Sequence, residues 1–353
     1  MIDNFFGYDS VDISDDGTSV IIIDQTELPS KELFLNLKNE EDVAEAITSL
    51  RVRGAPAIGI AASFGICVIV KNLLPKDYTV YLSEFKRVYD ILLNTRPTAV
   101  NLRNCLERLK STLNIIIQDG CTCVEEIQER VLEEAKLIKS EDIEHNIKMG
   151  ELGLSLLKPG STILTYCNAG HLAVSRFGSA LSPVYLARSR GVTIKVFACE
   201  TRPLMQGARL TTYELLRAGV DTTLICDNMV SSVMSRGLID AVITGCDRIA
   251  ANGDVANKIG TSMVAILASY YKIPHYIIGP STTIDPGCKS GDDIVIEERS
   301  CAEVTGKWFK NQMAPEGVKV YNPAFDITPA KLVSAIITEK GIFRYPYNFI
   351  IEE

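Results

Sequence analysis

The chain has 353 residues, enough for about two domains of roughly 150 residues each. Hydrophobic residues make up 46% and charged residues 23% of the sequence, as in an ordinary soluble globular protein with a sizeable core. The net charge of −8 argues against a nucleic-acid partner, because proteins that bind DNA or RNA gather lysines and arginines on one face. A small phosphorylated ligand is compatible with this charge, since it needs only a local group of donors.

The N-terminal third mixes short strands and helices. Residues 19–24 predict a strand, and residues 40–50 predict an amphipathic helix that leads into a basic turn at 51–56. The apolar run 57–70 has 14 residues, short of the ~20 that a membrane helix needs. It therefore predicts a buried core helix and no membrane span. Residues 97–102 are expected to begin a further helix.

A change of pattern marks the second half of the chain. Residues 122–157 carry helical periodicity with many charges, which predicts long helices that join two lobes. Strand and helix patterns then alternate, which predicts a parallel sheet covered on both faces. The expected strands are 161–166, 192–198, 221–226, 241–244 and 275–279. We therefore expect an α/β protein with an N-terminal α/β domain at 1–122, a helical linker at 123–158 and a Rossmann-like C-terminal domain at 159–353.

The sequence gives no indication of a cofactor or a metal. The GxGxxG and GxxxxGK[ST] motifs of dinucleotide and nucleoside-triphosphate sites are missing. The ten cysteines form no CxxC pair or Cys/His quartet, and the histidines have no metal-ligand spacing. One of them, His275, is expected in the core because it lies inside a strand-like run. The N-terminus has no pattern of a secretory signal, so we expect a reduced, cytoplasmic protein.

Polar clusters follow four of the expected strands. If those strands are parallel, the clusters share one rim of the sheet, which is where open α/β sheets bind ligands. The clusters are 167–171, 200–209, 227–228 and 247–248. The block 245–260 is the most informative segment, since it holds two carboxylates, a guanidinium, two amides and a lysine within 16 residues. The alternative is a charged surface loop, which the apolar residues inside the block argue against.

Two residues at these strand ends are candidates for acid–base chemistry. Cys167 precedes a turn of small residues that we expect to open a helix, and a helix N-terminus lowers the pKa of a nearby thiol. The alternative is a buried structural cysteine. Asp247 follows another strand, and burial in an apolar site would raise its pKa so that it could act as a general acid. The alternatives for Asp247 are a salt bridge with Arg248 and a helix N-cap.

Further donors are candidates for binding a phosphate or a sugar. The turn Arg53-Gly54-Ala55 precedes a helix, where backbone N–H groups and a guanidinium can bind a phosphate together. Arg96 stands in a second such turn, and solvated surface is the alternative for both arginines. Asn257 and Lys258 are donors suited to sugar hydroxyls or a phosphate. Near the C-terminus, Asp326 is expected to cap a helix.

Seven segments, in order along nearly the whole chain, resemble the methylthioribose-1-phosphate isomerases. The broader superfamily also contains ribose-1,5-bisphosphate isomerases and the regulatory subunits of the translation-initiation guanine-nucleotide exchange factor 2B. The segments are RGAPAIG at 53–59, RPTAVNL at 96–102, CNAG at 167–170, ETRPLMQGARL at 200–210, the block 245–260, IEER at 296–299 and NPAFDITP at 322–329.

The resemblance implies a smaller N-terminal α/β lobe, a larger Rossmann-like C-terminal lobe, a homodimer and no cofactor. Cys167 and Asp247 match the positions of the family's catalytic pair. The positions that match the family's sugar-phosphate contacts are Arg53, Gly54, Ala55, Arg96, Gln206, Asn257 and Lys258. The implied reaction is the conversion of 5-methylthioribose 1-phosphate to 5-methylthioribulose 1-phosphate, a step of methionine salvage.

Three departures from the family's pattern leave the substrate open. Tyr166 stands where the family usually has His, His171 where it has a small residue, and Cys246 where it has Ala. A related branch isomerises 5-deoxyribose 1-phosphate, and these changes could mark it. A ribose-1,5-bisphosphate isomerase would need cations for a second phosphate. The non-enzymatic alternative, a regulatory subunit that binds a sugar phosphate or nucleotide, would be expected to lack the Cys/Asp pair.

Overall fold

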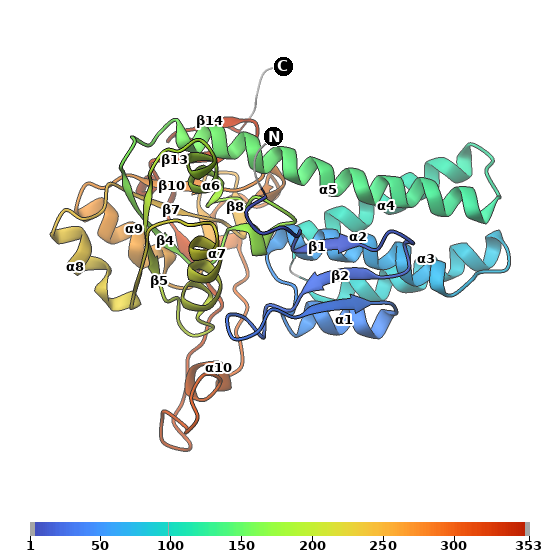
Figure 1. Ribbon diagram of the computed structural model, residues 1–353, viewed down its shortest axis with the longest axis horizontal. Helices are drawn as coiled ribbons and strands as arrows, with labels where there is room; N and C mark the ends of the chain where they lie inside the picture. Colours follow the sequence, from blue (N-terminus) through green and yellow to red (C-terminus); the bar gives the residue numbers. More distant parts are fainter. Residues whose placement is uncertain (1–3, 98, 350–353) are drawn as a thin grey trace. The chain divides into compact units, whose positions relative to one another are not determined.

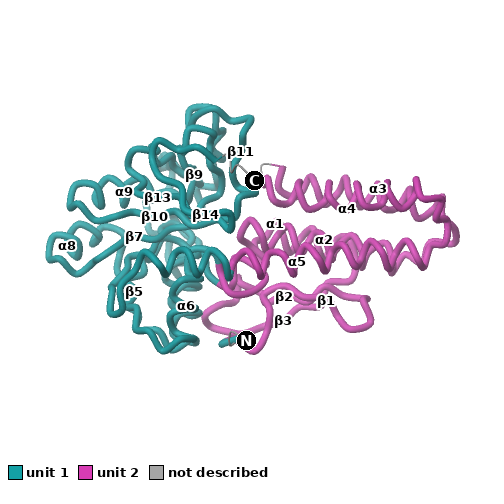
Figure 2. The backbone as a smooth tube through the Cα atoms, turned by 90° about the horizontal axis from the view of Figure 1, so that it is seen from above, with its two compact units in different colours: residues 1–5, 147–170, 179–353 teal, residues 6–146, 171–178 magenta. Residues whose placement is uncertain are grey.

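The structure is a computed structural model that describes residues 4–97 and 99–349. The chain forms two compact units, which Figure 2 shows in different colours. Within the described ranges, unit 1 consists of residues 4–5, 147–170 and 179–349, and unit 2 consists of residues 6–146, without 98, and 171–178. The short segment 171–178 therefore belongs to a different unit from the chain on either side of it.

Unit 2 combines a small antiparallel sheet with helices. The predicted strand at 19–24, the helix at 40–50 and the helix that begins near residue 100 are all confirmed, although Thr98 lies outside the described residues. The strands, in sheet order, are β1 (Val11–Ile13), β2 (Val20–Ile23) and β3 (Phe34–Leu37). The helices are α1 (Glu40–Thr48), α2 (Ala55–Asn72), α3 (Tyr78–Thr95), α4 (Val100–Gln118) and the first part of α5 (Val124–Leu154).

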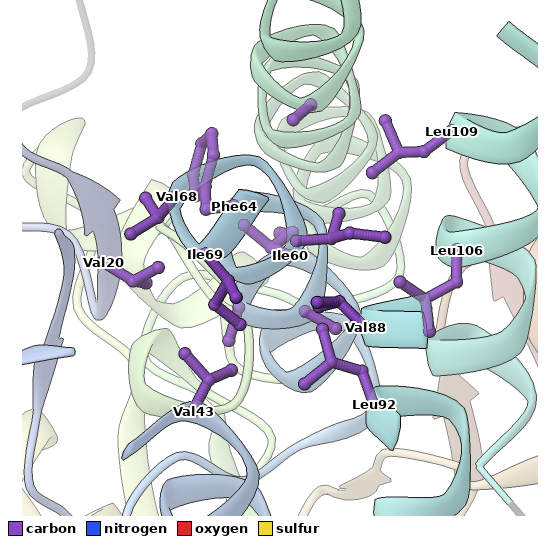
Figure 3. Close-up of a cluster of buried hydrophobic side chains, with 14 of the residues drawn as sticks. Val20, Val43, Ile60, Phe64, Val68, Ile69, Val88, Leu92, Leu106 and Leu109 are labelled. Carbon is purple, nitrogen blue, oxygen red and sulfur yellow. The ribbon is translucent and has the colours of Figure 1, made fainter. Parts of the chain in front are cut away.

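Helix α2 is the centre of the core of unit 2. This helix is long and apolar enough to cross a membrane, but 72% of its 18 residues are buried inside the structure. Figure 3 shows its side chains among those of β2, α1, α3 and α4. The labelled residues of this cluster are Val20, Val43, Ile60, Phe64, Val68, Ile69, Val88, Leu92, Leu106 and Leu109. The predicted buried core helix at 57–70 is therefore confirmed.

Unit 1 contains a seven-stranded sheet within the described residues, in the order β14-β13-β10-β7-β4-β5-β6. All neighbouring pairs are parallel except β13 and β14, and Figure 1 shows most of these strands side by side. All five expected strands are present, and the Rossmann-like parallel sheet is confirmed. The strands are β4 (Thr162–Tyr166), β5 (Lys195–Cys199), β6 (Thr222–Ile225), β7 (Ala241–Thr244), β10 (His275–Ile278), β13 (Ala335–Thr338) and β14 (Gly341–Phe343).

Helices cover both faces of this sheet. On one face, Leu164 and Val242 pack with residues of α8 (Val230–Ser235) and α9 (Thr261–Tyr270). Val242 pairs with His275, so Ile278 points to the opposite face, because side chains alternate along a strand. There Gly153 at the end of α5 lies close to Ile278 and to Pro183 of α6 (Ser182–Ser189), where a Cβ on the glycine would lie 2.9 Å and 2.5 Å from them.

A smaller sheet lies within unit 1 and contains part of the block 245–260. Its strand order is β11-β8-β9-β12, and β8 and β9 form a hairpin around Asn252 and Gly253. The strands are β8 (Arg248–Ala250), β9 (Val255–Lys258), β11 (Ile284–Asp285) and β12 (Phe325–Thr328). Arg248, Asn257 and Lys258 are therefore held on paired strands, whereas Asn252 and Asp254 lie in the turn that joins β8 to β9.

His275 is fully buried in β10, as predicted, and its Nε2 lies 2.9 Å from Oγ1 of Thr244. Burial lowers the pKa of His275 from 6.5 to about 4. Between these values the unfolded chain binds a proton that the folded protein does not, so the free energy of unfolding falls as the pH falls. From pH 7 to pH 5 this histidine should account for a loss of about 2 kcal/mol. Urea unfolding of His275→Asn should show a flatter pH dependence than the unsubstituted protein, and parallel profiles would contradict this assignment.

Candidate active site

The site begins at the carboxyl ends of β4 and β7, which are neighbours in the sheet. From β4 the chain continues to β5 and β6 on one side, and β7 then returns to the other side of β4. This reversal is a topological switch point, where open α/β sheets bind ligands. Tyr166 and Thr244, the last residues of the two strands, are paired. Cys167 and Asp247 come one and three residues after them, so both lie at this switch point.

The turns that follow β4 and β7 are in contact. A Cβ on Gly245 would lie 2.9 Å from Cβ of Ala169, so this position leaves little room for a side chain. The backbone N–H of Asp247 donates to the carbonyl of Ala256 at 2.9 Å, directly before Asn257. Cys167, Asp247 and the start of the donor segment 257–258 therefore lie at one edge of unit 1.

One of the two structural alternatives for Asp247, the helix N-cap, is not what the fold shows. Asp247 precedes strand β8, and the N-cap of the next α-helix, α9, is Gly260. Arg248 forms an ion pair with Asp285, with Nη1 and Oδ2 3.6 Å apart. The carboxyl group of Asp247 is thus positioned by a hairpin and not by a helix terminus.

The local structure around Cys167 differs from the expectation in one respect. Cys167 has a left-handed backbone, with φ of 66°. The turn after it leads to a short 3-10 helix, His171–Ala173, and the next α-helix of the described chain is α6, which begins at Ser182. The helix that this turn was expected to open is therefore only a three-residue 3-10 helix and not an α-helix. The small residues of the turn instead take the chain into the segment 171–178 of unit 2.

Gln206 comes directly before a π-helical turn, Gly207–Thr211, which leads into α7 (Thr212–Arg217). Its side chain is only 5% exposed, and Oε1 has no hydrogen-bond partner among the residues that the structure describes. A buried amide oxygen without a partner is costly, so this atom is suited to accept a hydrogen bond from a ligand hydroxyl.

The donors at the end of β9 are buried. Nδ2 of Asn257 donates to Oγ1 of Thr261 at 3.0 Å. Nζ of Lys258 donates to the carbonyl of Ala324 at 3.0 Å and lies 4.6 Å from the ring centroid of Phe325. These contacts hold both side chains in place before any ligand binds.

The predicted helix cap at Asp326 is confirmed. Its carboxylate accepts hydrogen bonds from the backbone N–H groups of Gly260 and Ser262, at 2.7 and 3.0 Å. The capped helix is α9, which precedes Asp326 in the sequence. This cap links β12 to the turn that follows Asn257 and Lys258.

The three departures from the family's pattern lie in different surroundings. Tyr166 is buried, and a Cβ on Gly260 would lie 2.1 Å from its hydroxyl oxygen. Burial raises the pKa of Cys246 to about 12, and its Sγ lies 3.5 Å from Oγ1 of Thr283, so this thiol stays protonated. His171 is buried in unit 2 and stacks on Phe6, with ring centroids 4.0 Å apart.

The remaining expected binding residues belong to unit 2. Gly54 is the N-cap of α2, with φ of 95°, and Ala55 is the first helical residue. A Cβ on Gly54 would lie 2.2 Å from the carbonyl oxygen of Ala173, so only glycine fits there. Arg53 and Arg96 are both half-buried. Unit 2 therefore holds the expected contacts at 53–55 and 96, and unit 1 holds those at 167, 206, 247 and 257–258.

Sequence patterns gave no signal for two residues that contact Cys167. Thr201 lies inside the family-like segment 200–210, and Thr211 lies one residue beyond it. Both side chains bond to the backbone of Cys167. Over the described ranges, no group of three or more His, Cys, Asp or Glu side chains could hold a metal ion.

Comparison with known proteins shows that this α/β protein has relatives that align with it over nearly its whole length. The Initiation factor 2 subunit family matches residues 51–345. A methylthioribose-1-phosphate isomerase of Parabacteroides distasonis is 56% identical over 92% of this chain and 96% of its own. A 5-deoxyribose 1-phosphate isomerase of Petrotoga mobilis is 53% identical over 93% of this chain and 94% of its own.

The solved structures agree with this result. The crystal structure of 5-methylthioribose 1-phosphate isomerase from Pyrococcus horikoshii OT3 superimposes with a TM-score of 0.89 at 42% identity, covering 96% of this chain and 93% of that one. The chain belongs to the Initiation factor 2 subunit family, and the resemblance to the methylthioribose-1-phosphate isomerases is confirmed.

Proposed function

We propose that the protein is an aldose–ketose isomerase that converts 5-methylthioribose 1-phosphate to 5-methylthioribulose 1-phosphate. The observation that carries the proposal is the position of Cys167 and Asp247 after adjacent parallel strands at the topological switch point. The names of the relatives at 56% and 42% identity support the reaction. The presence of both residues of the pair argues against the non-enzymatic alternative, a regulatory binding subunit.

In the proposed mechanism the sugar ring must open before isomerisation. The phosphate on the anomeric oxygen prevents the simple opening that a free sugar undergoes, so the enzyme has to supply an acid. Asp247, in its protonated form, donates its proton to the ring oxygen as the bond between that oxygen and C1 breaks. In one route the Cys167 thiolate then removes the proton from C2 to give an enol, and this enol takes up a proton at C1 while its C2 hydroxyl loses its own proton to form the ketone. In the other route a hydride moves from C2 to C1 while the C2 hydroxyl loses its proton, and Cys167 shapes the site.

Substrate binding is assigned to the remaining candidate residues. Arg53, Arg96 and Lys258 would neutralise the phosphate, and the backbone at Gly54 and Ala55 would donate N–H groups to it. Gln206 and Asn257 would bind sugar hydroxyls. We further propose a cytoplasmic homodimer without a cofactor, in which residues 1–122 and 159–353 act as domains joined by the linker 123–158. The mass of the purified protein in solution tests the dimer.

The second candidate substrate is 5-deoxyribose 1-phosphate. The relative with this name is 53% identical, against 56% for the relative named after the methylthio sugar, so identity does not separate the two. Both sugars present an apolar group at C5. A ribose 1,5-bisphosphate would instead require a second group of cations.

The test is the turnover of the purified protein on methylthioribose 1-phosphate, 5-deoxyribose 1-phosphate and ribose 1,5-bisphosphate, compared as kcat/KM. We expect the highest value for the methylthio sugar. A higher value for the deoxy sugar would replace the substrate and keep the reaction class. No turnover of any of the three would overturn the isomerase proposal. Deuterium at C2 that is retained at C1 of the product would support hydride transfer, and its loss to solvent would support proton transfer.

A further inference from the structure

The backbone of Cys167 is fixed by two threonine side chains. Its N–H donates to Oγ1 of Thr201 at 2.8 Å, and its carbonyl accepts from Oγ1 of Thr211 at 2.7 Å. These bonds hold the peptide planes on both sides of the Cα atom. Since φ and ψ together set the direction of the Cα–Cβ bond, the Thr201–Thr211 pair also sets the direction of the thiol.

The conformation that the pair holds is one that a cysteine rarely adopts. Cys167 has φ of 66° and Thr201 has φ of 64°, both in the left-handed region. Residues other than glycine persist there only when their surroundings hold them, and they concentrate at functional sites. The two left-handed residues are bonded to each other across neighbouring strand ends.

Further hydrogen bonds orient both threonine hydroxyls. Oγ1 of Thr201 also donates to the carbonyl of Cys199 at 3.0 Å. The backbone of Thr201 is held as well, since its N–H donates to the carboxylate of Asp227 at 2.8 Å. Thr211 also accepts from Nδ2 of Asn168 at 3.2 Å. Each hydroxyl therefore has both a donor and an acceptor as partners, which defines the position of its hydrogen atom.

We propose that Thr201 and Thr211 are positioning residues for Cys167, which hold its backbone in the left-handed conformation and so aim the thiol at the substrate. This inference rests on the proposed isomerase function. The two threonines act through Cys167 and need not touch the substrate. Their effect should therefore fall on kcat and on the reactivity of the thiol, with little effect on KM.

The test uses Thr201→Val and Thr211→Val, which keep the size of the side chain and remove the hydroxyl. Thr201→Ser and Thr211→Ser keep the hydroxyl and should restore activity. The matched control is Thr212→Val, since the Thr212 hydroxyl donates to the carbonyl of Ala208 within its own segment. We expect each of the two Val variants to lower kcat by about 10–100-fold, because small misplacements of a reacting group cost this much. KM should change by less than about threefold, and the control should keep the kcat of the unsubstituted protein.

A second measurement does not depend on turnover. The rate of alkylation of Cys167 by iodoacetamide, followed by peptide mass mapping across a pH series, should change its pH midpoint in the two Val variants and not in Thr212→Val. If both Val variants keep kcat within threefold and an unchanged alkylation profile, the inference is wrong. If one variant does not fold, the other carries the test. If the unsubstituted protein has no isomerase activity but alkylation responds as expected, the proposed function fails while the positioning role stands.

Discussion

Replacing Cys167 by serine, or Asp247 by asparagine, is expected to lower kcat by about 10²–10⁴-fold with little change in stability. Serine keeps the shape of the side chain, but its hydroxyl does not form the anion that a thiol forms near neutral pH. Asparagine fills the space of Asp247 and cannot give a proton to the ring oxygen. Each change thus removes one acid–base function and leaves the packing of the switch point almost intact.

The control for this prediction is Cys226→Ser. Cys226 follows β6 at the same edge of the sheet and is half-buried, yet it has no role in the proposed chemistry. Turnover of all three variants should be measured on the preferred sugar phosphate, with folding checked by circular dichroism. Full turnover by Cys167→Ser, or an equal loss in Cys226→Ser, would refute the assignment of Cys167. Full turnover by Asp247→Asn would refute the general acid.

The strands of unit 1 could be predicted because each is a short apolar run followed by polar residues. A parallel sheet then requires all those polar ends to share one edge, so the neighbourhood of Cys167 and Asp247 follows from topology. The hairpin of β8 and β9 was not predicted, because the three residues Arg248–Ala250 are too few to show the alternation of polar and apolar side chains that marks a strand. Only pairing across the turn at Asn252 and Gly253 identifies it.

The path of residues 171–178 could not be predicted, because long-range contacts set it. The backbone N–H of Ser10 donates to the carbonyl of Ser175 at 2.9 Å, and Nε2 of Gln25 donates to the carbonyl of Leu172 at 2.7 Å. These partners are more than a hundred positions away in the sequence. A local pattern of small residues after Cys167 therefore suggested a helix start, whereas the folded chain uses them to enter unit 2.

A large loss of stability is expected from Gly54→Ala, which should reduce the free energy of unfolding by about 3 kcal/mol or more. Two effects act together at this position. Alanine is strained at φ of 95° and ψ of 135°, and its Cβ would lie 2.2 Å from the carbonyl oxygen of Ala173 and 2.5 Å from its Cα. Both contacts are with backbone atoms, so relief requires the turn at 171–173 to move.

Gly7→Ala separates the two effects, because Gly7 also lies in unit 2 and has φ of 74°, but a Cβ there would have no atom within 4 Å. It should show only the conformational cost, about 1–2 kcal/mol. Urea unfolding and hydrogen exchange of the α2 amides measure the difference. Equal losses in the two variants would mean that the close approach to Ala173 is not made. A larger loss of stability in Gly54→Ala would mean that glycine is required at this position for packing. A fall in the isomerase activity of that variant could then not by itself demonstrate that residue 54 binds the phosphate.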